Sequence, residues 1–254
     1  MKKFYYIVLV LVILLILQNK AACQDWQIRS SRHFIIYHRD TPAGYLNQLA
    51  LKAENYYKSI TSNLGFKRFD FWSWDNRCRI FLYPDRASYL KATGSISWSR
   101  AHVYVVEKHI ITYAGQEGFF ETILPHEMAH IIFREFIGFD KKLPMWIDEG
   151  VAILAESDSK QRLAYAKDTV SKGKNVSLSE LSDIRNYSLI DPYIFYNQAA
   201  SIVNFLLNKY GRNNFMNFCR EVRDNDWEEA LRRVYKFDSL GELERQWLEY
   251  VAGS

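Results

Sequence analysis

Hydrophobic and polar residues follow two different periods along this chain, one typical of strands and one typical of helices. Short β-rich runs predict strands at residues 33–38, 79–83, 101–106 and 110–113. Between the first two runs, apolar residues recur every three to four positions over 43–63, which predicts a long helix. From Gly118 onward the helical period predicts helices over 119–137, 145–156, 192–210, 213–222, 227–235 and 240–251. A sheet-forming N-terminal half followed by a helical C-terminal half predicts an α+β fold.

The first residues of the chain have the pattern of a targeting segment. Two lysines precede an unbroken apolar run over residues 4–17, and small residues follow before Cys23. This pattern is typical of a secretory signal peptide, and a retained membrane anchor fits the same residues. Cys23 is also a candidate for lipidation. We therefore expect residues 1–23 to be a signal peptide or membrane anchor and residues 24–254 to form a single domain that is exported and faces outward.

The composition is that of a globular protein that has no evident affinity for nucleic acid. Of the 254 residues, 48% are hydrophobic and 24% are charged, which excludes an intrinsically disordered chain. The formal net charge is +4, and three lysines in the N-terminal segment account for most of it. The rest of the chain is close to neutral, so we expect no nucleic-acid partner.

Two cysteines, Cys78 and Cys219, lie outside the N-terminal segment. In an oxidising compartment they can form a disulfide. Two separate buried thiols fit the sequence equally well, because the sequence gives no distance between them. The chain has no Cys-x-x-Cys pair, so the sequence does not support zinc or redox chemistry based on cysteine.

The motif that indicates chemistry is His126-Glu127-Met128-Ala129-His130, an HExxH sequence within the predicted helix 119–137. On a helix, positions i and i+4 differ by roughly 40° and lie about 6 Å apart along the axis. Both imidazoles can therefore bind one divalent metal ion. Glu127 then lies beside the metal, where a base can take a proton from metal-bound water.

A third metal ligand is predicted further along the chain. A catalytic zinc ion has three protein ligands and an open fourth position. Glu149 lies within the apolar stretch 143–152 of a predicted helix, eighteen residues after His130. An unpaired carboxylate is costly in such surroundings, and a metal ion removes that cost. The alternative is an acidic residue on an exposed face of the helix.

These motifs resemble those of the gluzincin metallopeptidases, which follow HExxH with a glutamate ligand on a second helix. The eighteen-residue gap and the W-x-x-E-G-x-A string at 146–152 are similar to the aminopeptidase N branch and, more closely, to peptidase MA-like domains. The likeness includes residues 196–201 and covers about 32–251. It implies a gluzincin-like, thermolysin-type fold. Residues 115–118 do not match the glycine-methionine-glutamate-asparagine motif that holds a free amine in aminopeptidases, so exopeptidase activity is not implied.

The resemblance implies one zinc ion per chain, held by His126, His130 and Glu149. It also implies that Glu127 is the general base, which passes a proton from zinc-bound water to the leaving amine. Related families often use a tyrosine on a later helix to donate to the oxyanion, and Tyr196 stands at the matching place. The expected function is a zinc-dependent metallopeptidase. The alternative is a catalytically inactive, peptidase-like module that binds zinc or peptides at the cell surface.

Three further assignments concern residues around this predicted site. Tyr193 lies one helical turn before Tyr196 and is the alternative oxyanion donor. Asp148 can orient an imidazole, although exposure to solvent or pairing with a neighbouring base is the favoured interpretation. Gluzincins bind substrate as an added strand along the sheet edge nearest the metal helix. The resemblance therefore makes 101–106 the expected binding edge for a peptide or protein substrate.

Overall fold

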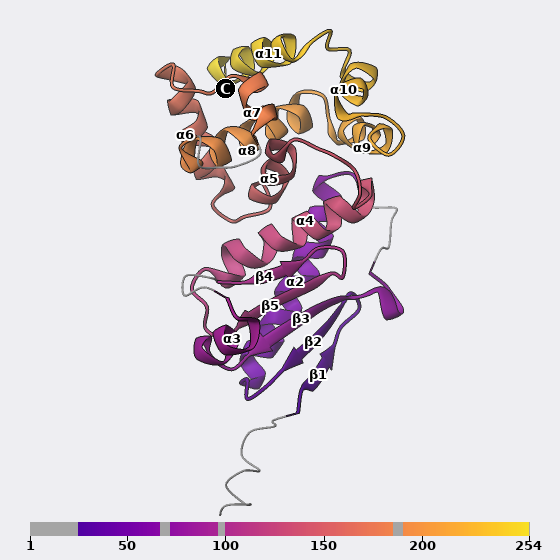
Figure 1. The fold of residues 1–254 in the computed structure, drawn as a ribbon, viewed down its shortest axis with the longest axis vertical. Coiled ribbons are helices and arrows are strands. Elements are labelled where there is room, and N and C mark those ends of the chain that lie inside the picture. Colours follow the sequence, from indigo (N-terminus) through magenta and orange to yellow (C-terminus); the bar gives the residue numbers. More distant parts are fainter. Residues whose placement is uncertain (1–24, 67–71, 96–99, 185–189, 254) are drawn as a thin grey trace, which may run out of the picture.

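Five strands form a mixed sheet in the computed structural model, which describes residues 25–66, 72–95, 100–184 and 190–253 (Figure 1). The strands are β1 (Gln27–Ser30), β2 (Phe34–His38), β3 (Cys78–Tyr83), β4 (His102–Tyr104) and β5 (His109–Tyr113). Their order across the sheet is β1-β2-β3-β5-β4. The inner strands β2, β3 and β5 run parallel, and the edge strands β1 and β4 run antiparallel to their neighbours. The four predicted strands are confirmed, although the one expected over 101–106 is limited to His102–Tyr104, and β1 is an additional strand.

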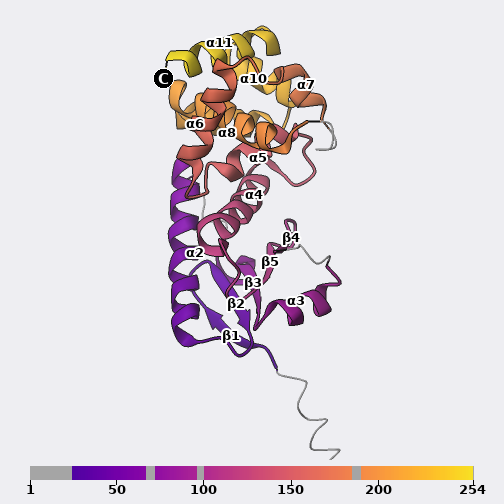
Figure 2. The ribbon, with the colours of Figure 1, turned by 90° about the vertical axis from the view of Figure 1, so that its left-hand side faces the viewer.

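Alternate residues of the inner strands build the core on one face of the sheet. The fully buried members are Phe34, Ile36, Cys78, Ile80, Leu82, Ile110 and Thr112. This period of two is expected of strands that have one covered face. The predicted helix is confirmed as α2 (Ala43–Asn63), which connects β2 to β3. Figure 2 shows α2 on one side of the sheet and α3 (Arg86–Thr93), which was not predicted, on the other.

The C-terminal half of the protein is helical. Its helices are α4 (Leu124–Ile137), α5 (Met145–Ile153), α6 (Ser159–Ser171), α7 (Leu178–Asp183), α8 (Pro192–Lys209), α9 (Arg212–Glu221), α10 (Trp227–Tyr235) and α11 (Leu240–Gly253). The predicted helices are confirmed, although the one expected over 145–156 ends at Ile153. The structure adds α6 and α7, which are short or mostly polar and therefore have a weak apolar period.

The predicted helix 119–137 is not regular throughout. It begins with a π-helical turn at Phe119–Ile123, and α4 follows. Pro125 has no N–H to donate to the carbonyl of Glu121, four residues earlier. The N–H of Ser157 donates to that carbonyl instead, at 2.9 Å. Because of Pro125, the carbonyl of Glu121 is available to accept from Ser157. This hydrogen bond connects the segment after α5 to the π-helical turn before α4.

Helices α5 and α8 are in close contact at Gly150. A Cβ atom at this position would lie 2.5 Å from the carbonyl oxygen of Ala199 and 2.6 Å from Cγ2 of Val203. Only glycine fits such a contact without a shift of one of the helices. Because Glu149 is the adjacent residue, this contact also fixes the position of the predicted third ligand.

Both cysteines of the described chain are free thiols. Cys78 lies in β3 and Cys219 in α9, and both are fully buried. The structure thus has the two separate buried thiols that the sequence left as one of two alternatives. Burial raises the pKa of each thiol well above its ordinary value, so neither is poised to react as a thiolate.

The predicted signal peptide or anchor, residues 1–23, lies outside the described residues. Within the ranges that the structure describes, none of the helices has the length and apolar character needed to cross a membrane.

Candidate metal centre

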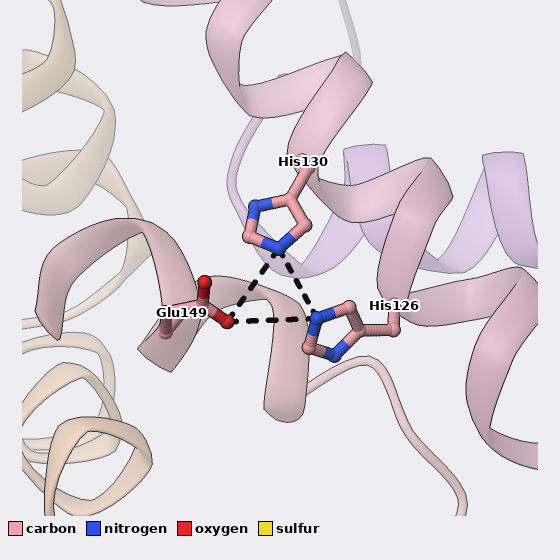
Figure 3. Close-up of side chains that lie close together, drawn as sticks. All are labelled: His126, His130 and Glu149. Carbon is pink, nitrogen blue, oxygen red and sulfur yellow. Dashed lines mark hydrogen bonds and ion pairs between the residues drawn. The ribbon is translucent and has the colours of Figure 1, made fainter. Parts of the chain in front are cut away.

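Helices α4 and α5 bring the three predicted ligands together, as Figure 3 shows. Nε2 of His126 and Nε2 of His130 lie 3.1 Å apart. The Oε2 atom of Glu149 lies 3.5 Å from the first nitrogen and 3.6 Å from the second. The helical spacing of the two histidines and the eighteen-residue gap to Glu149 therefore produce one cluster of potential metal ligands.

The separations and the chemistry of these atoms fit a zinc ion. Zinc bonds of about 2.0–2.1 Å in tetrahedral geometry place neighbouring ligand atoms roughly 3.3 Å apart, close to the three distances above. Two histidines and one glutamate form a donor set of catalytic zinc sites, which keep a fourth position open. The three side chains are 14–20% exposed, so solvent reaches the cluster.

A carboxylate lies behind each imidazole. Nδ1 of His126 is 2.7 Å from Oε1 of Glu156, and Nδ1 of His130 is 3.1 Å from Oδ1 of Asp148. Each Nδ1 can donate its proton to the carboxylate, which leaves the lone pair of Nε2 for the metal. The arrangement thus selects the ring tautomer that a metal site needs.

Asp148 combines two of the roles considered for it. It orients His130, which was the less favoured interpretation, and its Oδ2 accepts from Nε of Arg134 at 2.7 Å, so it also pairs with a neighbouring base. The expectation that it faces solvent is wrong, because the side chain is 17% exposed. Burial raises the pKa of Asp148, but the hydrogen bond and charge of His130, followed by those of Arg134, outweigh burial and hold this pKa below its ordinary value.

Glu156 is a site residue that the sequence reasoning missed. Its side chain is 6% exposed, and its second oxygen pairs with Nη2 of Arg162 in α6 at 3.0 Å. The N–H of the adjacent Ser157 donates to the carbonyl of Glu121, so the backbone here is fixed to the π-helical turn that precedes α4. The position of Glu156 seven residues after Glu149 is the only sequence feature that could have suggested this role. That position is informative only if the chain turns back toward His126 at the end of α5.

Replacing Glu156 with Ala is expected to weaken zinc binding about 10- to 100-fold, because the ring of His126 loses the acceptor that orients it. Zinc affinity measured by competition with a chromophoric chelator checks this. Glu249→Ala is the matched control, since this glutamate in α11 is 61% exposed. Equal affinities for the two variants would contradict the assigned role.

Protons compete with a metal ion for these ligands. Burial lowers the pKa of His126, but hydrogen bonds with Glu149 and Glu156 outweigh burial and raise it to about 9. Burial is likewise outweighed at His130, where hydrogen bonds with Asp148 and Glu149 raise the pKa to about 10. Metal binding must therefore release protons, and it weakens as the pH falls.

Glu127 follows His126 on α4 and is partly buried. Burial raises the pKa of its carboxyl group, and the neighbouring His126 and His130 counteract part of this shift. A carboxyl group in such surroundings takes up a proton more readily near neutral pH than an exposed one does. The role of Glu127 as the general base stays a prediction.

The tyrosines considered as oxyanion donors both lie near the start of α8. Tyr196 precedes Ala199 by three residues and therefore lies on the side of α8 that meets Gly150 in α5. It packs partly buried against the core. Tyr193 is 47% exposed, and its ring lies 4.4 Å from that of Tyr165 in α6. The packing favours Tyr196 over Tyr193, and the role of Tyr196 stays a prediction.

The expected substrate edge is the free edge of β4. This strand pairs with β5, and its other side has no partner among the described strands. Figure 1 shows β4 on the side of the sheet next to α4. An edge strand offers unpaired N–H and C=O groups to which an extended peptide can bind.

The sheet, the helix behind its edge and the cluster of two histidines and a glutamate define a gluzincin-type metallopeptidase domain. The chain belongs to the Peptidase MA superfamily, whose family model matches residues 93–253. The fold extends beyond that match, because β1, β2, β3 and α2 precede it.

Comparison with solved structures supports the same fold. The protein is similar to the M1 zinc metallopeptidase from Deinococcus radiodurans, with 18% sequence identity and a TM-score of 0.50. The likeness covers 89% of this chain and 51% of the other, so this chain spans about half the length of that protein. No curated protein matches the chain significantly.

Proposed function

We propose that this protein is a zinc-dependent peptidase that hydrolyses peptide bonds at the centre formed by α4 and α5. The observation that carries the proposal is the convergence of His126, His130 and Glu149, with a carboxylate behind each imidazole. Membership of the Peptidase MA superfamily supports peptides or proteins as substrates.

The chain supplies a residue for each task in this reaction. When bound, zinc supplies the Lewis acidity that activates a water molecule and polarises the scissile carbonyl. His126, His130 and Glu149 would hold the ion. Glu127 takes a proton from the attacking water and delivers it to the leaving amine. Backbone groups of β4 hold the substrate in an extended conformation, so affinity depends weakly on the side-chain sequence.

Tyr196 donates a hydrogen bond to the oxyanion in this proposal. Tyr196→Phe removes the hydroxyl and should lower kcat about 100- to 1,000-fold, with little change in KM, because the bond forms in the transition state. Steady-state kinetics on one peptide measure both constants. Tyr193→Phe is the matched control and should leave kcat unchanged. A loss of activity in the control variant alone would assign the role to Tyr193.

We also propose that the protein acts outside the cytoplasm, because residues 1–23 have the pattern of a signal peptide or membrane anchor. The intact mass of the mature protein distinguishes cleavage, lipidation at Cys23 and retention of the segment. Recovery of the full-length chain in the cytoplasmic fraction would contradict export.

Zinc content and cleavage of an unstructured protein together test the proposed function. We expect one zinc ion per chain, cleavage of reduced carboxymethylated casein, loss of cleavage with a chelator and recovery with added zinc. Glu149→Ala should lose the metal. Stoichiometric zinc without cleavage would support the inactive zinc- or peptide-binding module instead. Absence of zinc would refute the peptidase and the zinc-binding module.

A further inference from the structure

An arginine lies behind each of the carboxylates that contact the two imidazoles. Arg162, near the start of α6, donates from Nη2 to Oε2 of Glu156 at 3.0 Å. The other oxygen of Glu156 lies 2.7 Å from Nδ1 of His126. Arg162 is 23% exposed and Glu156 is 6% exposed, so both charges are largely withdrawn from water. A row of three side chains therefore runs from α6 to the imidazole, and the carboxylate in the middle has one oxygen for each neighbour.

The second imidazole has the same arrangement. Oδ1 of Asp148 lies 3.1 Å from Nδ1 of His130, and its Oδ2 accepts from Nε of Arg134 at 2.7 Å. Arg134 is 19% exposed, and its Nη1 also donates to the carbonyl of Lys141 at 2.8 Å. Arg134 follows His130 by one turn of α4, whereas Arg162 comes from a separate helix. The same order of groups is thus produced by two different parts of the fold.

The arginine in each row fixes the direction in which the carboxylate points. An ionised carboxylate is costly to bury unless its charge and both of its oxygens are matched. Without Arg162, Oε2 of Glu156 would lose the donor that it now has. The side chain would then turn toward another donor or toward solvent, and Oε1 would leave Nδ1 of His126. The orientation of this ring, and with it the direction of the Nε2 lone pair, depends on that contact.

A positive charge near a cation site also has an opposing effect, because Arg162 repels a bound metal ion. Its charge is balanced, however, by the carboxylate of Glu156 with which it is in contact. The two opposite charges largely cancel for an ion that lies beyond the imidazole. Loss of a group that orients a metal ligand typically costs about 10- to 100-fold in metal affinity. We therefore expect the loss of orientation to outweigh the relief of repulsion.

We propose that Arg162 and Arg134 are positioning residues of the metal centre, each of which holds one imidazole in the metal-binding orientation through the carboxylate that it pairs with. The proposal rests on zinc binding, which is part of the proposed function, but not on peptide cleavage. It gives α6 a role at the centre, although this helix supplies none of the three candidate ligands.

Zinc affinity in a double-mutant cycle tests the proposal. Arg162→Met is expected to weaken zinc binding about tenfold, as measured at one pH by competition with a chromophoric chelator. In a chain that already carries Glu156→Ala, the same replacement should cause no further weakening, because the arginine then has no carboxylate to hold. Arg162→Lys should recover most of the loss, since an ammonium group can also donate to Oε2.

Bound Co²⁺ gives a second measurement, which a general loss of stability would not affect in the same way. Its visible absorption bands depend on the geometry of the ligands, so Arg162→Met and Glu156→Ala should change the bands of the Co²⁺-loaded chain alike. Lys172→Met is the matched control, because it removes an exposed ion pair with Asp168 from the same helix. It should leave both the zinc affinity and the Co²⁺ bands unchanged.

Arg134→Met repeats the cycle at the second imidazole, with Asp148→Ala as the background. The two rows are tested independently, so one decides the question if a variant of the other does not fold. Tighter zinc binding by the arginine variants, or equal weakening with and without the carboxylate, would overturn the proposal. If the wild-type chain binds no zinc, the proposed function fails. If it binds zinc and Arg162→Met behaves like Lys172→Met, only the positioning role fails.

Discussion

Replacing Glu127 with Gln is expected to lower peptide cleavage about 100- to 10,000-fold while zinc stays bound. The amide has the size of the carboxylate but cannot take a proton from the attacking water or return it to the leaving amine. Since His126, His130 and Glu149 remain, the metal affinity should change little. Zinc analysis and single-turnover cleavage of a fluorogenic peptide give the two values on the same preparation.

Glu121→Gln is the matched control for this variant. Glu121 lies in the π-helical turn before α4, is 53% exposed and pairs with Lys52 at 3.2 Å. An exposed pair contributes at most about 1 kcal/mol, and the side chain is not part of the cluster, so activity should stay near that of the wild type. Equal activity of Glu127→Gln and the wild type would show that Glu127 is not the base.

The sequence predicted the elements whose apolar residues face a single core. The period of α2 is clear because seven of its residues are buried on one face, and its ends agree with the prediction. Strand β1 was missed because all four of its residues are exposed, so no alternation marks it. Helix α6 was missed because only Ala166 and Thr169 are buried along its thirteen residues. The spacing of apolar residues along a segment reflects which of its side chains are buried. A helix or strand with few buried side chains therefore has only a weak apolar pattern.

The three candidate ligands could also be predicted from the sequence. The residues that orient their side chains could not. His126 and His130 are brought together by local helix geometry, and the motif around Glu149 supplies the third group. The partners of their rings depend on how separate helices meet. Glu156 reaches His126 only because the chain turns after α5 and is tied to α4 through a carbonyl that Pro125 leaves free. No local pattern encodes such a contact.

A buried ion pair links the proposed substrate edge to the metal helix. Lys108, in the turn between β4 and β5, is 7% exposed. Its Nζ donates to Oε1 of Glu135 in α4 at 2.9 Å and to Oδ1 of Asn76 at 2.6 Å. The other oxygen of Glu135 accepts from Nε1 of Trp72 at 2.6 Å. Glu135 is five residues after His130, so this network connects the turn after β4 to the helix that carries two of the metal ligands.

Replacing Lys108 with Met is therefore expected to lower the free energy of unfolding by about 3–5 kcal/mol, because Glu135 stays buried without a countercharge. Urea denaturation measures the change. Lys52→Met is the matched control: it removes the exposed pair with Glu121 and should cost at most about 1 kcal/mol. Adding Glu135→Leu to Lys108→Met should restore part of the loss, since the unpaired charge is then gone. If Lys108→Met costs no more than Lys52→Met, the pair does not hold β4 to α4, and the substrate edge must be positioned by the backbone pairing of β4 with β5 alone.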